Sequence, residues 1–193
     1  MIRFNDYGYL DPGTYELTFD QLKKSVLVHG ETWIAGWDAE WRLTLVNRLE
    51  RLVPYLWDYG VEHIYVDGSF CSDKPRPRDI DCFYDFQIPD EIMEIEDEVR
   101  RHEVILDYFE IFSEQLNKKF DEPIWSIWKR EFVDEKGIRQ TLMWERLKVE
   151  LMPNCWGIYA GDWYPGGKLR KFDEFFRYDR VGTEKGIILL KKG

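Results

Sequence analysis

The sequence predicts an α/β (α+β) fold in which helices flank a β-sheet. Apolar residues at helical spacing form one long face between residues 38 and 59. Short runs rich in β-branched and aromatic residues occur at 63–66, 79–86 and 187–190. The chain has 193 residues, of which 44% are hydrophobic and 17% aromatic, so it can bury a core and is not wholly disordered.

A length of 193 residues fits a single domain. We expect that domain, 1–193, to comprise an N-terminal lead-in (1–36), a core (37–153) and a C-terminal extension packed on the core (154–193). The first thirteen residues are rich in turn formers and predict an irregular or extended start.

Two helices are expected in the first third of the chain. Thr18 and Gln21 have the spacing of a capping box, which predicts a short helix running to about Leu27. The apolar face predicts a longer helix from about Asp38 to Tyr59, which Pro54 should kink or split.

The second half predicts helices and strands in alternation. Residues 90–120 indicate a helix in one or two pieces, with Ile105, Tyr108, Phe109 and Phe112 buried. A hairpin turn is expected at 134–137, followed by a return strand over 139–152. Residues 168–178 predict a short amphipathic helix, with a last strand at 187–190.

Charge and hydropathy exclude several classes of protein. The 27 Lys and Arg and 37 Asp and Glu leave a net charge of −10, which disfavours a bulk nucleic-acid partner because phosphate binding needs a cationic surface. No run approaches the roughly 20 apolar residues of a membrane helix. The N-terminus shows no apolar signal core, so we expect a cytoplasmic protein without membrane contact.

The cysteines and histidines do not indicate a metal or disulfide site. Cys71, Cys82 and Cys155 are scattered and contain no Cys-x-x-Cys pair, which disfavours a disulfide framework or a structural zinc site. The three histidines are also far apart and are interpreted as structural.

Gly68, Ser69, Asp79 and Asp81 are the residues most indicative of chemistry. A predicted strand ends at Gly68-Ser69, where a residue without a Cβ lets a phosphate approach the backbone. Nine residues later the chain enters a second predicted strand with Asp79 and Asp81, whose Cα atoms would lie about 7 Å apart on one face. Two such carboxylates suit a divalent cation, and a third acid would allow two metals roughly 4 Å apart.

This segment resembles the nucleotidyltransferase superfamily whose core is shared with DNA polymerase beta. The resemblance implies a mixed sheet flanked by helices, with Asp79 and Asp81 as catalytic metal ligands for Mg²⁺ or Mn²⁺. It implies a third acid on a later strand. Glu150, between Val149 and Leu151, is preferred, and Glu145 remains the rival.

The same resemblance implies a nucleoside triphosphate as substrate. Gly68 and Ser69 would cradle its β- and γ-phosphates. Lys74 would contact the phosphates, neutralise the aspartates or face solvent. Arg180 and Lys185 would also bind the phosphates if the C-terminal end folds back over the site.

A second resemblance, spanning the whole chain, is to a bacterial and phage family of small nucleotidyltransferase-like proteins of unknown function. It rests on Phe4-Asn5, Gly8, the segment Leu10 to Gly13, Asp67 to Phe70, Lys74 in the loop, Arg180 to Gly182 and Lys185 to Ile187. We expect transfer of a nucleoside monophosphate to a hydroxyl of a protein or small molecule, with ATP among the candidate donors. The alternatives are a weak or inactive binding module, such as a toxin–antitoxin or phage-defence component, and phosphoryl hydrolysis at the same metals.

Overall fold

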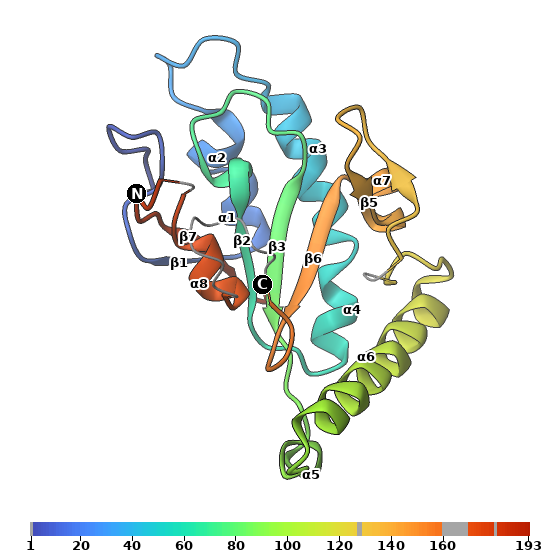
Figure 1. Cartoon of the computed structure of the whole chain (residues 1–193). Helices are drawn as coiled ribbons and strands as arrows, with labels where there is room; N and C mark the ends of the chain where they lie inside the picture. Colours follow the sequence, from blue (N-terminus) through green and yellow to red (C-terminus); the bar gives the residue numbers. More distant parts are fainter. Residues whose placement is uncertain (1, 127–128, 160–169, 180) are drawn as a thin grey trace.

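The computed structural model describes residues 2–126, 129–159, 170–179 and 181–193. A five-stranded mixed sheet lies at its centre with helices around it, which confirms the predicted α+β fold (Figure 1). The strands, in spatial order, are β1 (Thr14–Leu17), β7 (Ile187–Leu190), β2 (Ile64–Asp67), β3 (Ile80–Asp85) and β6 (Val149–Asn154).

The two ends of the chain both contribute to this sheet. Strand β7, predicted at 187–190, runs parallel to β1 and antiparallel to β2, while β3 is antiparallel to β2 and parallel to β6. The lead-in thus supplies the edge strand β1, and the C-terminal extension supplies a strand inside the sheet. Strand β1 is absent from the predicted elements because it follows turn formers and lies next to a strong helix signal.

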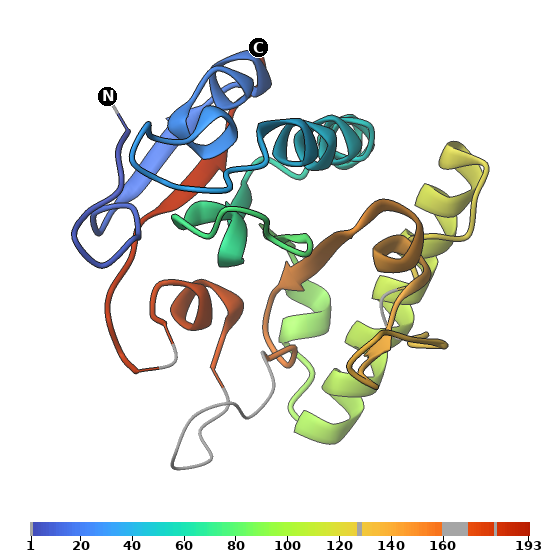
Figure 2. The same cartoon turned by 90° about the horizontal axis from the view of Figure 1, so that it is seen from above.

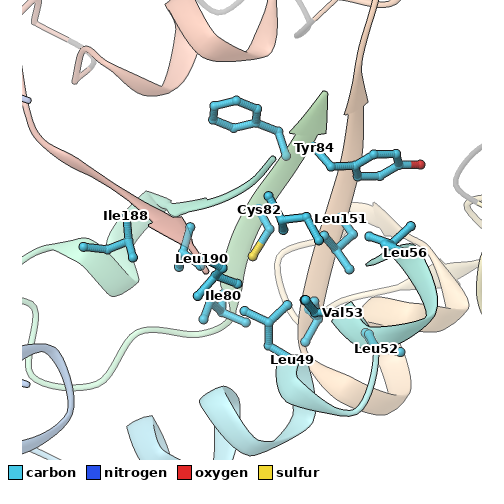
Figure 3. Packing of buried hydrophobic residues seen from close by; sticks show 14 of the residues in the cluster. Leu49, Leu52, Val53, Leu56, Ile80, Cys82, Tyr84, Leu151, Ile188 and Leu190 are labelled. Atoms are coloured by element: carbon cyan, nitrogen blue, oxygen red, sulfur yellow. The ribbon is translucent and has the colours of Figure 1, made fainter. Parts of the chain in front are cut away.

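One face of the sheet is apolar and packs against two helices, α3 (Ala39–Glu50) and α4 (Val53–Asp58). Figure 3 shows side chains of these helices next to side chains of β3, β6 and β7. The predicted long helix is split between α3 and α4, with Pro54 in the first turn of α4, as expected for a residue without an amide hydrogen.

The opposite face carries polar and aromatic side chains and is covered by α8 (Phe172–Phe176) (Figure 2). Phe176 stacks on Phe83 with ring centroids 5.6 Å apart, and Phe83 stacks on Tyr65 at 4.6 Å. This aromatic stack, defined as Tyr65, Phe83 and Phe176, joins α8 to the middle of the sheet. The described part of the predicted helix at 168–178 is therefore confirmed, in a shorter form.

The short N-terminal helix is divided in two. Helix α1 (Phe19–Lys23) begins with the predicted capping box, in which Thr18 and Gln21 each accept a hydrogen bond from the other's backbone. A second N-cap at Ser25 then starts α2 (Val26–His29).

The predicted helix over 90–120 is α5 (Asp90–Met93) followed by α6 (Glu98–Phe120). Ile105 and Phe109 are buried as expected, but the prediction for Tyr108 is wrong, since 37% of it is exposed. Within the described ranges, every helix is too short or too polar to cross a membrane.

The predicted return strand over 139–152 is wrong in its middle. The hairpin exists as β4 (Phe132–Val133) and β5 (Arg139–Gln140), but helix α7 (Leu142–Leu147) follows. Thr141 caps that helix by accepting a hydrogen bond from the Trp144 amide, and Lys148 ends it in a left-handed conformation at φ 55°. Only from Val149 does the chain join the main sheet as β6, which continues through Pro153 to Asn154.

Candidate functional site

The Gly-Ser turn lies at the sheet edge where β2 ends and β3 and β6 begin (Figure 1). After Asp67 the chain enters a 3₁₀ turn, η1 (Gly68–Cys71). Gly68 has φ 69°, and a Cβ there would overlap the carboxylate of Asp81. Both the backbone conformation and the close approach therefore require glycine.

Three carboxylates form one row across the sheet. Asp67 is paired with Asp81 in the β2–β3 register, and Asp81 is paired with Glu150 in the β3–β6 register. Directly opposed residues project to the same face. The structure therefore brings Asp81 and Glu150 together beside the Gly68 turn, whereas the rival acid Glu145 is exposed on α7 and paired with Lys148 at 3.5 Å.

Burial and mutual repulsion raise the pKa values of this row. Burial raises the pKa of Asp81 well above its usual range, and the nearby charges of Asp79, Glu150 and Asp67 add to the effect. Burial also raises the pKa of Glu150, an effect that Arg130 opposes. Such desolvated, mutually repelling acids are typical of functional sites, and a bound cation would relieve their repulsion.

Asp79 lies just before β3 rather than within it. Its carboxylate accepts a hydrogen bond of 2.6 Å from the Trp144 indole and lies 3.3 Å from Nε of Arg78. Asp79 therefore does not share strand β3 with Asp81 as expected, although the two acids are close enough for their charges to interact.

Cationic side chains surround the acids. Arg130 lies 3.4 Å from Oε1 of Glu150. Arg78 bridges Asp79 and Asp134, and both it and Lys148 lie over the Trp144 ring, at 5.0 and 3.7 Å from its centroid. A phosphate group near the carboxylates would thus meet several charge-assisted donors.

Lys185, predicted to bind phosphate, is buried and forms a 2.9 Å ion pair with Asp67. Although burial opposes it, the attraction of Asp67 raises the pKa of Lys185. Burial raises the pKa of Asp67 to about 6. The segment before β7 therefore brings Lys185 to the acid row, defined as Asp67, Asp81 and Glu150, where Lys185 is already paired with Asp67.

The other predicted phosphate ligands are placed differently. Ser69 is half-buried in η1, and Lys74 is exposed on the loop between η1 and β3. Arg180 lies outside the described residues.

Arg42 is a site residue that the sequence analysis missed. Its guanidinium is fully buried and donates to four carbonyls, three of which belong to the segment that follows the Gly-Ser turn: those of Leu27, Phe70, Ser72 and Lys74. It also lies 4.1 Å from the Trp37 ring centroid. Burial lowers the pKa of Arg42 to about 10. The sequence shows only an arginine beside the apolar stripe of a helix. The carbonyls to which Arg42 donates are distant in the sequence, so their hydrogen bonds could not be predicted.

The donors at this site suit a hard divalent cation such as Mg²⁺, which prefers carboxylate and phosphate oxygens. Within the described residues, the buried Oε1 of Glu150 and Oδ1 of Asp67 accept no hydrogen bond, although Arg130 lies 3.4 Å from the Glu150 atom. In that same part of the chain, however, no three acidic, histidine or cysteine side chains converge as a preformed metal site. Asp79 is hydrogen-bonded to Trp144 and lies beside Arg78, so the carboxylates fit the ion in kind but are not arranged around one.

The comparisons with known proteins give a family and no neighbour of known activity. No curated protein and no solved structure matches the chain. The model of one family of unknown function, DUF6932, matches residues 2–191, which is nearly the whole sequence. The chain therefore belongs to the DUF6932 family.

Proposed function

We propose that this protein is a metal-dependent nucleotidyltransferase that transfers a nucleoside monophosphate from a nucleoside triphosphate to a hydroxyl group and releases pyrophosphate. One observation carries the proposal. Asp81 and Glu150 lie directly opposite each other on β3 and β6, and the Asp81 carboxylate is in contact with the Gly68 turn. Carboxylates placed against a glycine turn suit the binding of a metal–triphosphate complex.

Asp79, Asp81 and Glu150 would hold Mg²⁺ or Mn²⁺. When bound, the ion would neutralise the negative charge that develops on the triphosphate oxygens. Gly68 and Ser69 would hold the β- and γ-phosphates, with Lys74 reaching them from the exposed loop. Lys185 would support this end of the site through its ion pair with Asp67.

The chemical step needs a base for the acceptor hydroxyl. Its oxygen bonds to the α-phosphorus, the bond from that phosphorus to the bridging oxygen breaks, and pyrophosphate leaves with the bond electrons. Glu150 takes the hydroxyl proton. Burial raises the pKa of Glu150, which strengthens its carboxylate as a proton acceptor.

The acceptor is proposed to be a protein side chain or a small molecule rather than bulk nucleic acid. The net charge of −10 supports this choice, because a long polyanion would be repelled. The proposal includes a cytoplasmic location, which the three unbridged cysteines, all within the described residues and all buried, support.

The test is incubation with each nucleoside triphosphate labelled at the α-phosphate, with cell extract and Mg²⁺. Label should move to an acceptor, pyrophosphate should appear, and chelation by EDTA should abolish both. Asp81→Asn and Glu150→Gln should each lower the rate at least about a hundredfold. Glu145→Gln is the matched control and should retain the rate, because Glu145 is exposed on α7. Free nucleotide without labelled acceptor would indicate hydrolysis.

A nucleotide-binding module without catalysis is the second candidate, as in a toxin–antitoxin or phage-defence component. The favouring observation is that Asp79 is held by Trp144 and Arg78, away from a converged metal site. Under this alternative, nucleotide or partner binding would survive the combined Asp79→Ala and Asp81→Ala change, and no pyrophosphate would form with any triphosphate.

A further inference from the structure

A cavity of about 540 Å³ lies at the end of the sheet opposite the acid row. It lies where β2 begins and β3 ends, next to α5 and α6 (Figure 1). Its volume is within the range of roughly 300–1,000 Å³ that is usual for small-molecule sites. Four aromatic rings contribute to the lining, namely those of Tyr59, Phe86, Tyr108 and Phe112.

These rings form one connected surface. Phe112 lies 5.6 Å from Tyr59 and 4.9 Å from Phe86 between ring centroids, and Phe86 lies 5.8 Å from Tyr108. Tyr59 and Tyr108 are 39% and 37% exposed, and Lys119 already lies 5.4 Å from the centroid of the Tyr59 ring. Aromatic faces of this kind attract alkyl chains and cations.

The charges at the cavity are almost all negative. Glu62, Asp85 and Asp90 line it, and Glu62 and Asp90 are exposed. Among the described residues of the lining, His63 is the only one able to carry a positive charge, and it lies 3.3 Å from Asp85. Asp85 also accepts a 3.0 Å hydrogen bond from the Asn154 amide, so the exposed carboxylates of Glu62 and Asp90 are the ones that favour a cationic ligand.

The cavity is separate from the proposed nucleotide site. Asp85 lies four residues beyond Asp81 on β3, a rise of about 13 Å. The aromatic stack of Tyr65, Phe83 and Phe176 occupies the sheet face between them. A single small ligand would not reach both.

We propose that this cavity binds a small aliphatic polyamine. Its ammonium groups would meet the exposed carboxylates of Glu62 and Asp90, and its methylene chain would lie along the aromatic rings. A polyamine fits better than a metal ion, because a metal ion makes no use of the aromatic surface. A volume of about 540 Å³ suits a small molecule.

The test is calorimetric titration of the full chain with spermidine, without nucleotide or Mg²⁺, so that its outcome is independent of nucleotidyl transfer. Saturable one-to-one binding is expected. 1,8-Octanediol, an uncharged chain of similar length, should bind at least about tenfold more weakly, and competition by excess Mg²⁺ should be slight.

Substitutions in the lining test whether spermidine binds in this cavity. The double change Glu62→Gln with Asp90→Asn should weaken spermidine binding about tenfold, and Tyr108→Leu about threefold. Glu110→Gln, an exposed carboxylate on the same helix as Tyr108 but outside the lining, is the matched control and should change little. Absence of saturable binding, equal affinity for the diol, or equal loss in the control would overturn the proposal.

Discussion

Gly68 and Asp81 are in direct contact, and each restricts the other. The backbone of Gly68 passes so close to the Asp81 carboxylate that any Cβ at position 68 would overlap it. Gly68 also has φ 69°, a conformation that residues with a side chain rarely adopt. The turn after β2 and the acid on β3 are therefore a single structural unit, and a change in one should alter the other.

Substitution Gly68→Ala should lower the free energy of unfolding by more than backbone strain alone. The left-handed conformation costs a residue with a Cβ about 1–2 kcal/mol, and the overlap with Asp81 adds to it. Gly60→Ala is the matched control, because Gly60 has φ +84° with no atom within 4 Å of the added Cβ. Urea denaturation should show the larger loss for Gly68→Ala, and equal losses would contradict the contact.

Replacing Arg42 by lysine should loosen the segment after the Gly-Ser turn. A single ammonium cannot replace the guanidinium donors that reach four separate carbonyls, so we expect a loss in the free energy of unfolding of at least about 2 kcal/mol. Hydrogen exchange of the amides of residues 70–74 should accelerate. Arg48→Lys, a half-buried arginine on the same helix, should leave that exchange unchanged. Equal exchange in both variants would refute a holding role for Arg42.

The Asp67–Lys185 pair should behave as a coupled unit. Lys185→Met leaves a fully buried carboxylate without its cation, which costs about 3–5 kcal/mol. Adding Asp67→Asn removes that charge, so the double variant should regain most of the lost free energy of unfolding. Chemical denaturation of the two single variants and the double variant measures the coupling, and simple additivity would count against it.

Asp67 should also make stability depend on pH. Burial raises the pKa of Asp67 from 3.8 to about 6, so the folded chain binds this proton more tightly than the unfolded chain. The contribution of Asp67 to the free energy of unfolding is therefore greatest below pH 4, falls by about 3 kcal/mol as the pH rises to about 6, and then stays level. Urea curves at several pH values should show this fall relative to Asp67→Asn. Parallel pH profiles for the two proteins would be the contrary result.

Elements with local signals were predicted correctly from the sequence. The capping box at Thr18 starts α1, Pro54 divides the long helix, and β7 occupies the predicted residues. The preference for Glu150 over Glu145 used its apolar neighbours, and Glu150 does lie on the strand beside Asp81. Its catalytic role stays a prediction.

Features that depend on distant contacts were not predictable in this way. Lys185 meets Asp67 across 118 positions of sequence, and nothing local distinguishes it from a solvent-exposed lysine. The carbonyls that accept hydrogen bonds from the Arg42 guanidinium belong to residues up to 32 positions away from Arg42 in the sequence. Helix α7 was missed because its aromatic and apolar residues also suit a strand, and the Thr141 cap decides between the two.

The indole of Trp144 should restrain metal binding. Its Nε1 donates a 2.6 Å hydrogen bond to the Asp79 carboxylate, which fixes the orientation of that group. Trp144→Phe removes the donor and keeps an aromatic ring, so Asp79 can turn toward the other acids and Mn²⁺ affinity should rise about threefold to tenfold. Electron paramagnetic resonance of free Mn²⁺ in a titration measures this affinity.

Trp125→Phe provides the matched control for that titration. Trp125 is buried like Trp144, but no described residue accepts a hydrogen bond from its Nε1. Its replacement should therefore lower stability through lost packing contacts without freeing a carboxylate, and the Mn²⁺ affinity should stay constant. If Trp144→Phe leaves the affinity unchanged or lowers it while the protein remains folded, Asp79 does not turn to a metal, and the case for a binding module without catalysis becomes the stronger one.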